Sequence, residues 1–408
     1  MTKKRKRKGL KVLLKVFVII VGFIVLTTGS IAISNVVLVK SNTKIAQGFT
    51  SLVKEDPLTP TLDENGYWTF TTDRDFVILQ LTDVHIGGGS FSSNKDKLAL
   101  NAISELVNTA KPDLIIVTGD IAYPVPFASG SFNNLNPTKV FANLMESLGV
   151  YWAVAFGNHD TEVYSYYNRE ELSKYYLSEE INYAQNKNAH CLFQTGPTDK
   201  IDGYGNYFIN VKNSQGLITQ SLVMIDSHSY IEGDYLGIKW RYDNIHQNQI
   251  DWYSAEITKL DQQNKAIDAN YPMIKSLAFF HIPLEEYLTA WREYTQNDNQ
   301  DTENVKYKYG VAGESGKIVY CGTYEDEMFE TMKELGSTQG MFVGHDHLNN
   351  FSIEYKGIRL TYGMSIDYLA YSGISEQTEQ RGGLVITTSN DSTFDCYGLR
   401  LHDKAIIN

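Results

Sequence analysis

Aspartate, asparagine and histidine side chains follow five separate apolar runs of this chain. They are Asp83 and His85, Asp120, the stretch Asn158, His159 and Asp160, then His281, and finally His345 and His347. Imidazole and carboxylate groups are common metal ligands, and ligands of α/β proteins collect beyond the carboxyl ends of strands. Each short motif alone is weak evidence, but five in one chain predict a shared metal site at one sheet edge.

The types of donor atom limit which metal ions the predicted site could bind. The candidate ligands offer nitrogen and oxygen atoms without a thiolate, which suits Fe, Mn or Zn better than Ca or Cu(I). Gly119, Gly157 and Gly344 lie beside them, and glycine lets the backbone turn sharply next to a crowded site.

The strands and helices that must position these residues alternate along the chain. The sequence predicts a strand over 76–85, a helix over 95–110, a strand over 113–120, a helix beginning at Asn136 and Pro137, and a strand over 150–160. Such a β-α-β-α-β order is typical of an α/β fold.

Beyond Asp160 the pattern loosens into a region rich in Tyr and Asn. Strands are predicted at 221–226, 276–283, 340–347, 359–363 and 383–389, with a helix at 326–335. His228 and His246 lie in this region without motif partners, so surface or structural roles are expected. Ordinary packing is expected of Trp240, Tyr242, Trp252 and Tyr253, with walls of a substrate cleft as the alternative.

Composition supports a folded body. The 408 residues are 42% hydrophobic and 12% aromatic, which excludes a disordered chain. Three widely spaced cysteines exclude a disulfide framework and a CxxC zinc site.

The N-terminus differs from the rest. Residues 1–15 form a basic head, and Val16–Val39 is a 24-residue run without a charge. At about 1.5 Å per residue this run can cross the ~30 Å core of a bilayer. Because positive charge stays cytoplasmic, we expect a signal-anchor with an extracytoplasmic C-terminal domain at the cell surface. A cleaved signal peptide is the alternative, although its apolar region is usually shorter.

The net charge of the chain limits which classes of molecule it could bind. The formal net charge is −12, and residues 1–40 hold nine Lys or Arg and no acid, so the remainder carries −21. Such a body is not expected to bind nucleic acid.

Residues 40–70 are polar with turn signals and predict a stem, which leaves 71–400 as the catalytic domain.

Together the motifs DxH, GD, GNHD, a strand ending in FxH, and GHxH resemble those of calcineurin-like metallophosphoesterases, over roughly residues 76–390. "GDIAY" and "AFFHIPLEEY" resemble the branch near purple acid phosphatases. The resemblance implies two packed mixed β-sheets flanked by helices. It also implies two metal ions, one on Asp83, His85 and His347 and one on Asn158, His281 and His345, bridged by Asp120.

One position departs from that branch. Tyr123 stands where purple acid phosphatases have a tyrosine that ligates ferric iron, but those enzymes lack the histidine found here as His85. Both side chains would compete for one coordination position, so we expect His85 to be the ligand and Tyr123 to line the site.

The implied chemistry is hydrolysis of phosphoesters by a metal-bridging hydroxide, because two cations lower the pKa of a bridging water and neutralise phosphoryl charge. His159 is expected to protonate the leaving oxygen. Asp160 is expected either to orient His159 or to cap the next helix. A phosphatase is predicted; the alternatives are a phosphodiesterase for nucleotide or lipid-linked substrates, and a non-catalytic surface binding module.

Overall fold

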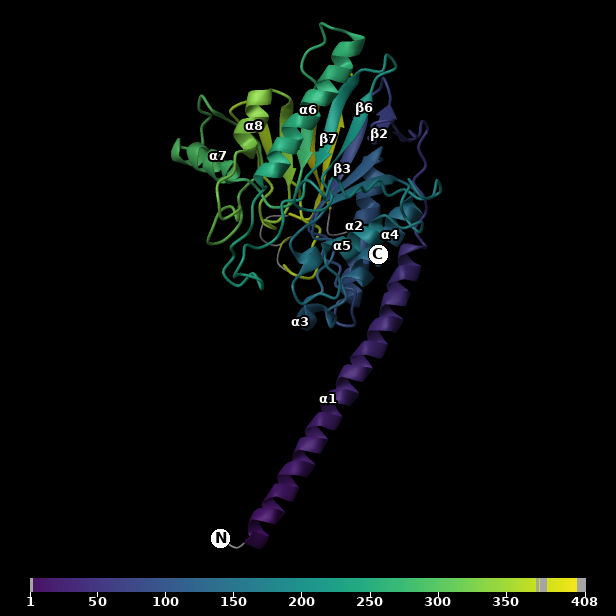
Figure 1. Ribbon diagram of the computed structural model, residues 1–408, viewed down its shortest axis with the longest axis vertical. Helices are drawn as coiled ribbons and strands as arrows, with labels where there is room; N and C mark the ends of the chain where they lie inside the picture. Colours follow the sequence, from purple (N-terminus) through teal and green to yellow (C-terminus); the bar gives the residue numbers. More distant parts are fainter. Residues whose placement is uncertain (1–2, 372–373, 375–379, 402–408) are drawn as a thin grey trace.

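The structure is a computed structural model that describes residues 3–371, 374 and 380–401. Two mixed β-sheets pack together, and helices cover both outer faces (Figure 1). One apolar core, which includes Leu79, Phe279 and Phe342, joins the two sheets. A second core lies between the larger sheet and the helices on its outer side. The predicted αββα fold is confirmed.

The five-stranded sheet has the order β14 (Phe394–Arg400), β13 (Gly382–Thr388), β3 (Phe76–Leu81), β4 (Leu114–Thr118) and β5 (Tyr151–Ala155). Strands β3, β4 and β5 are parallel, and β13 runs antiparallel to β3. The crossovers contain α2 (Ser93–Ala110), a short α3 (Pro126–Ser129) and α4 (Leu135–Leu148). Parallel strands place their carboxyl ends at one edge, which is where the first three ligand motifs fall.

The nine-stranded sheet has the order β1 (Thr61–Leu62), β2 (Trp68–Thr71), β6 (Tyr207–Lys212), β7 (Ile218–Met224), β8 (Ser276–Phe279), β10 (Thr338–Val343), β12 (Ile358–Tyr362), β11 (Ser352–Tyr355) and β9 (Val305–Tyr309). Its central strands β7, β8, β10 and β12 are parallel. Helices α6 (Gln247–Ile267), α7 (Glu285–Gln296) and α8 (Met328–Leu335) lie over its outer face, and α5 (Arg169–Tyr176) follows the β5 loop.

The first helix, α1 (Lys3–Ala46), extends away from the body (Figure 1). Residues Leu10–Ala46 form one helix long and apolar enough to cross a membrane, with a mean hydropathy of 2.6 over its most apolar window. Its N-terminal part is exposed, which suits a lipid environment and not a protein core.

Residues 40–70 were expected to form a stem, but they pack on the body. Residues 40–46 continue α1 against α2 and α4, and β1 and β2 join the larger sheet. The reason is burial: the side chains of Trp68 and Phe70 are 1% and 0% exposed. The folded domain therefore begins before residue 71.

Helix α4 also begins earlier than expected, at Leu135, so Pro137 lies inside its first turn. Proline is tolerated there because the N–H groups of a first turn have no partner within the helix.

Candidate metal centre

The seven predicted metal ligands converge where the carboxyl ends of both sheets meet. Asp83 and His85 follow β3, Asp120 follows β4 and Asn158 follows β5. His281 follows β8, and His345 and His347 follow β10. Five segments far apart in the chain thus contribute to one centre, three from the smaller sheet and two from the larger.

One group of donors, here called site B, contains Asn158, His281 and His345. The Nε2 atom of His281 lies 3.1 Å from Oδ1 of Asn158 and 3.3 Å from Nδ1 of His345. The second group, site A, contains Asp83, His85 and His347, whose ligand atoms lie within 4.8 Å of one another.

Asp120 connects the two groups. Its Oδ2 atom is 3.4 Å from Nε2 of His85 in site A and 3.1 Å from Nε2 of His281 in site B. Its other oxygen, Oδ1, accepts a hydrogen bond from the backbone N–H of His159 at 2.8 Å. A carboxylate held in this way can bridge two metal ions.

Hydrogen bonds in site B leave acceptor atoms facing one another. The Nδ1–H of His281 donates to the carbonyl of Thr118 at 2.7 Å, so its Nε2 holds a lone pair. Asn158 donates from Nδ2 to the hydroxyl of Tyr230, which turns its Oδ1 inward. On His345 it is Nδ1 that faces this group, at 3.3 Å from Nε2 of His281. Oδ1 of Asn158 and Nδ1 of His345 thus both lie within 3.3 Å of Nε2 of His281, an arrangement that suits one metal ion.

The pKa of His281 also indicates that positive charge is favoured in site B. Burial alone would lower this pKa, but the Asp120 carboxylate outweighs burial and raises it to about 9. A proton on Nε2 supplies that charge in the metal-free protein, and a metal ion bound by the Nε2 lone pair would replace the proton. The donor set therefore fits a metal centre.

The backbone at the site is strained. Asp83, His85, Asp120 and His345 have φ values of 48°, 51°, 53° and 76°, in the left-handed region that non-glycine residues avoid. Such residues cost roughly 1–3 kcal/mol each and cluster at functional sites. Gly157 is required for a different reason, since a Cβ atom there would lie 2.1 Å from Oδ1 of Asp120.

Asp367 is a site residue that the sequence analysis missed. Its Oδ2 atom lies 3.3 Å from Nδ1 of His85 and 3.6 Å from Nδ1 of His347. Burial alone would raise the pKa of Asp367, but the two imidazoles hold it below its usual range. Asp367 thus faces the far nitrogens of both histidines in site A, which leaves their Nε2 atoms for a metal.

Replacing Asp367 by asparagine should weaken metal binding at site A by about 10–100-fold, because the imidazoles lose the carboxylate that orients them. Titration of the metal-free protein with Mn²⁺ or Zn²⁺ measures this affinity. The control is Asp395→Asn, an exposed carboxylate on β14. Equal metal affinity in Asp367→Asn and the unmodified protein would contradict the assignment.

The carboxylate beside His159 is Glu162, not Asp160. Nδ1 of His159 lies 2.7 Å from Oε1 of Glu162, which also accepts a hydrogen bond from the Tyr230 hydroxyl at 3.1 Å. Asp160 instead accepts hydrogen bonds from the backbone N–H groups of Asp120, Ala122 and Gly157 at 2.8–3.0 Å. Asp160 therefore holds the loops together, and Glu162 is placed to orient His159.

Glu162→Gln should lower kcat by about 10-fold or more with little change in KM, because an amide orients the His159 ring less firmly than a carboxylate does. Steady-state kinetics on one phosphoester measure both constants. Tyr230→Phe, which removes only the neighbouring hydroxyl, should have the smaller effect on kcat. An unchanged kcat in Glu162→Gln would assign the orientation of His159 to another group.

A cavity of about 200 Å³ opens onto this centre. Its lining is mainly aromatic and histidine side chains with two acids: His159, Trp240, Tyr242, Glu314, Tyr320, His345, Asp346, His347 and Tyr371. The ring of Tyr242 lies 4.2 Å from that of His345, so Tyr242 and Trp240 are cleft residues, contrary to the expected packing role. Trp252 and Tyr253 do pack in the fold, against Phe208.

Tyr123 lies at the same centre as a neighbour of two histidines. Its ring is 4.9 Å from the rings of both His85 and His159. Burial and, next, the Asp367 carboxylate raise the pKa of Tyr123 to about 12, which favours the neutral phenol over a phenolate ligand. This arrangement supports a lining role for Tyr123.

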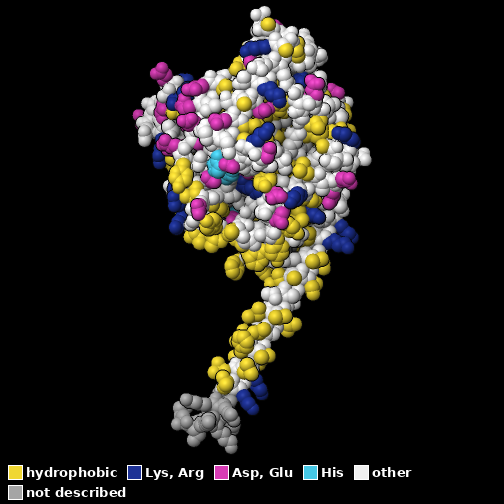
Figure 2. All heavy atoms as spheres, in the orientation of Figure 1, with side chains coloured by type: hydrophobic (Ala, Val, Ile, Leu, Met, Phe, Trp, Pro, Cys, Tyr) yellow, Lys and Arg dark blue, Asp and Glu magenta, His cyan; other side chains and the backbone are white. Residues whose placement is uncertain are grey.

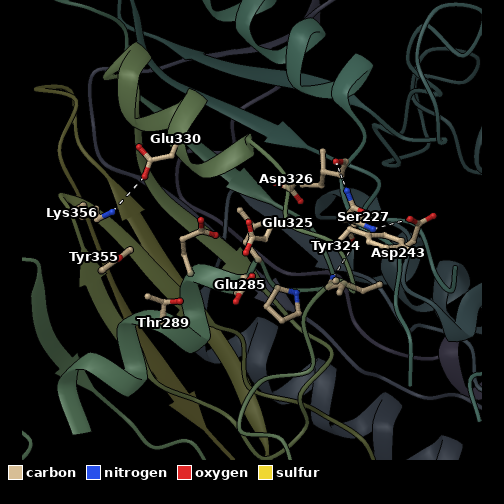
Figure 3. A pocket seen from close by; sticks show the side chains of 17 residues that line it. Ser227, Asp243, Glu285, Thr289, Tyr324, Glu325, Asp326, Glu330, Tyr355 and Lys356 are labelled. Atoms are coloured by element: carbon tan, nitrogen blue, oxygen red, sulfur yellow. Dashed lines mark hydrogen bonds and ion pairs between the residues drawn. The ribbon is translucent and has the colours of Figure 1, made fainter. Parts of the chain in front are cut away.

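A larger cavity, of about 310 Å³, is lined by residues 282–284 and by residues of α7 and α8 (Figure 3). Glu285, Glu325 and Asp326 are on its wall, and burial raises the pKa of Asp326 to about 6. Its lining includes none of the seven predicted ligands. Cavity size therefore does not identify the functional site in this molecule, whereas the donor chemistry does.

His228 and His246 form a separate pair with Asp243. Their rings are stacked 4.2 Å apart at 19°, and Nδ1 of His246 is 2.7 Å from Asp202. Lone pairs of stacked rings lie in parallel planes and do not converge on one ion. The pair therefore fits the structural role expected for it.

The chain is similar to several known proteins. Residues 76–349 match the model of the calcineurin-like phosphoesterase family. The chain is 30% identical over 330 residues to "Probable inactive purple acid phosphatase 14" of Arabidopsis thaliana, covering 75% of this chain and 74% of that protein. It is 28% identical over 340 residues to "Probable inactive purple acid phosphatase 29" of the same plant, covering 79% of each. Among solved structures, a dimetal phosphatase from Danio rerio aligns at 12% identity over 80% of this chain and 96% of that chain, with a TM-score of 0.48.

Proposed function

Because this chain belongs to the calcineurin-like phosphoesterase family, as its motifs predict, we propose that it hydrolyses phosphoesters at a dinuclear centre built from sites A and B. The observation that carries the proposal is the position of Asp120 Oδ2, within 3.4 Å of a histidine nitrogen of each site. The ligands would hold two Fe, Mn or Zn ions.

Two ions bound there would supply an activated water and neutralise charge on the phosphoryl oxygens. The side chains of the protein would position the substrate and supply a proton. Asp120 and the other ligands fix the position of the phosphoryl group against the cavity. His159, with Nδ1 held by Glu162, presents Nε2 to the leaving-group oxygen and donates a proton to it.

The cavity lining favours a substrate with a single phosphate. Among the described residues that line it there is no Lys or Arg, so no side chain supplies positive charge for a second phosphate. The aromatic walls suit an uncharged or apolar leaving group. This reasoning favours esters of one phosphate over pyrophosphates. Among such esters a phosphatase activity is the first candidate and a phosphodiesterase activity the second.

The full-length protein in detergent, loaded with Mn, Zn or Fe, tests the proposal. Hydrolysis of p-nitrophenyl phosphate is compared with that of bis-p-nitrophenyl phosphate. Metal-dependent turnover of the monoester supports a phosphatase, and preference for the diester supports a phosphodiesterase. Bound metal without turnover across a broad ester panel would support a binding module, consistent with the word "inactive" in the names of the plant relatives.

We also propose that α1 anchors the protein and that the body is extracytoplasmic. The basic residues before Val16 support this orientation, because positive charge is retained in the cytoplasm. Labelling of intact cells with a membrane-impermeant reagent tests it.

A further inference from the structure

Five large apolar or aromatic side chains are exposed together on one face of the body, and we call them the apolar rim. They are Phe91, Phe127, Phe132, Val163 and Tyr166, and Phe127 is 97% exposed. Figure 2 shows hydrophobic side chains gathered on the lower face of the body, next to the point where α1 leaves it. Single exposed apolar residues are common, but a contiguous group marks an interaction surface.

The rim belongs to the loops that carry the metal centre. Phe127 lies in α3, a few residues beyond Tyr123, and Val163 and Tyr166 follow His159 in the next loop. The two loops are joined, since the N–H of Tyr166 donates to the carbonyl of Phe132 at 3.1 Å. Whatever contacts the rim is therefore adjacent to the catalytic edge.

Helix α1 fixes the position of the rim. Asn35 of this helix donates from Nδ2 to the carbonyl of Gly130 at 2.8 Å and accepts at Oδ1 from the N–H of Ser90 at 2.7 Å. These two loop residues are the neighbours of Phe91 and of α3. The Asn35 side chain of α1 thus holds the loop that carries Phe91 and the loop that carries Phe127.

The length of α1 then places the rim at a bilayer surface. At about 1.5 Å per residue, residues 16–34 span roughly 28 Å, close to the ~30 Å of a hydrocarbon core. Val36 and Val37 are still exposed and apolar beside Asn35, and the next charge is Lys40, about one turn later. If residues 16–34 fill the bilayer core, the loops held by Asn35 lie at its boundary.

We propose that the apolar rim is seated in the membrane that α1 crosses, so that the metal centre acts on lipids whose headgroup ends in a phosphoester. This inference rests on the proposed function for its substrate, but the seating of the rim does not. The occupant is lipid and not an anionic surface as such, because the body carries −21. The tether supplies the effective concentration that a small apolar contact needs.

Spin labels test the seating in full-length protein in phosphatidylcholine nanodiscs. A label is placed by Phe127→Cys or, as the matched control, by Ile267→Cys at the far end of α6, where Ile267 is 55% exposed. Cys321 is first changed to Ser; Cys191 and Cys396 are buried. The label at 127 should be reached by oxygen in preference to an aqueous nickel chelate, and the label at 267 by the chelate. Equal chelate access at both positions would overturn the seating.

A second measurement tests the substrate class. The rate on phosphatidic acid in nanodiscs is divided by the rate on a soluble monoester for Phe127→Glu and for Ile267→Glu. The ratio should fall about 10-fold in Phe127→Glu and stay constant in Ile267→Glu. A constant ratio in both would overturn the lipid substrate. If neither ester is hydrolysed by metal-loaded protein, the proposed function fails, while the spin labels still decide the seating.

Discussion

Asp120→Ala should lower kcat/KM for phosphoesters by on the order of 10³-fold or more, the largest effect expected of any single substitution. The carboxylate of Asp120 is the only group among the predicted ligands with one atom within 3.4 Å of a histidine in each site. Without it, two cations bound at sites A and B would lose the anion that screens their repulsion. Metal content by elemental analysis should fall together with activity.

Two controls separate this loss from unfolding. Asp120→Asn keeps an oxygen that can accept from the N–H of His159, so it should fold normally while still losing the bridging charge. Asp395→Ala, on the exposed edge strand β14, should change neither metal content nor rate. Retention of activity within 10-fold by Asp120→Ala at full metal loading would rule out a bridging role.

His159→Asn should lower kcat by about 10²–10⁴-fold on alkyl phosphates while leaving metal content unchanged. The imidazole is oriented by Glu162 and is assigned here to protonation of the leaving oxygen. A p-nitrophenolate leaves readily without a proton, so the loss on p-nitrophenyl phosphate should be clearly smaller. Comparing the two esters therefore measures the acid role itself.

The chain provides a matched control for this substitution. His190 is paired with Glu146 at 2.9 Å, as His159 is with Glu162, but near the start of β5 and away from the centre. His190→Asn should leave both esters unaffected. A loss in His159→Asn that is equal for both esters would assign His159 to phosphate binding and not to proton donation.

The sequence predicted which residues gather at the candidate metal centre, because each of them follows a strongly apolar strand. Burial fixes such strands in the sheets, and the direction of parallel strands then brings their ends together. Asp367 escaped prediction because it follows β12 by several residues, through a turn that no local pattern specifies. Its role depends on two histidines, His85 and His347, that follow β3 and β10, and only the tertiary structure brings them near Asp367.

The role of Glu162 beside His159 was not predicted, and the reason is local. Asp160 is the nearer acid in sequence, but residues His159–Thr161 form a 3-10 turn. In such a turn the side chains at positions i and i+3 lie on the same side, so Glu162 meets His159 and Asp160 points toward the backbone. The spacing was available in the sequence, but the type of turn was not.

Several predicted strands share a property that two of the missed elements, β9 and α6, lack. Strands β3, β4, β8 and β10 are almost entirely buried and apolar, whereas β9 reads VKYKY and is half exposed at a sheet edge. Helix α6 was missed because polar residues dominate its sequence, QNQIDWYSAEITKLDQQNKAI. Tertiary contacts, not local pattern, determine such elements.

The absence of a free stem, since residues 40–46 pack on α2 and α4, has a kinetic consequence. If α1 is the membrane anchor proposed above, the body joined rigidly to it cannot sample the volume that a flexible linker of the same length would sweep. Encounters with a membrane-borne ester then occur by lateral diffusion in two dimensions. The relevant concentration is the mole fraction of that ester among the surrounding lipids, so adding inert lipid dilutes the substrate even when its bulk concentration is constant.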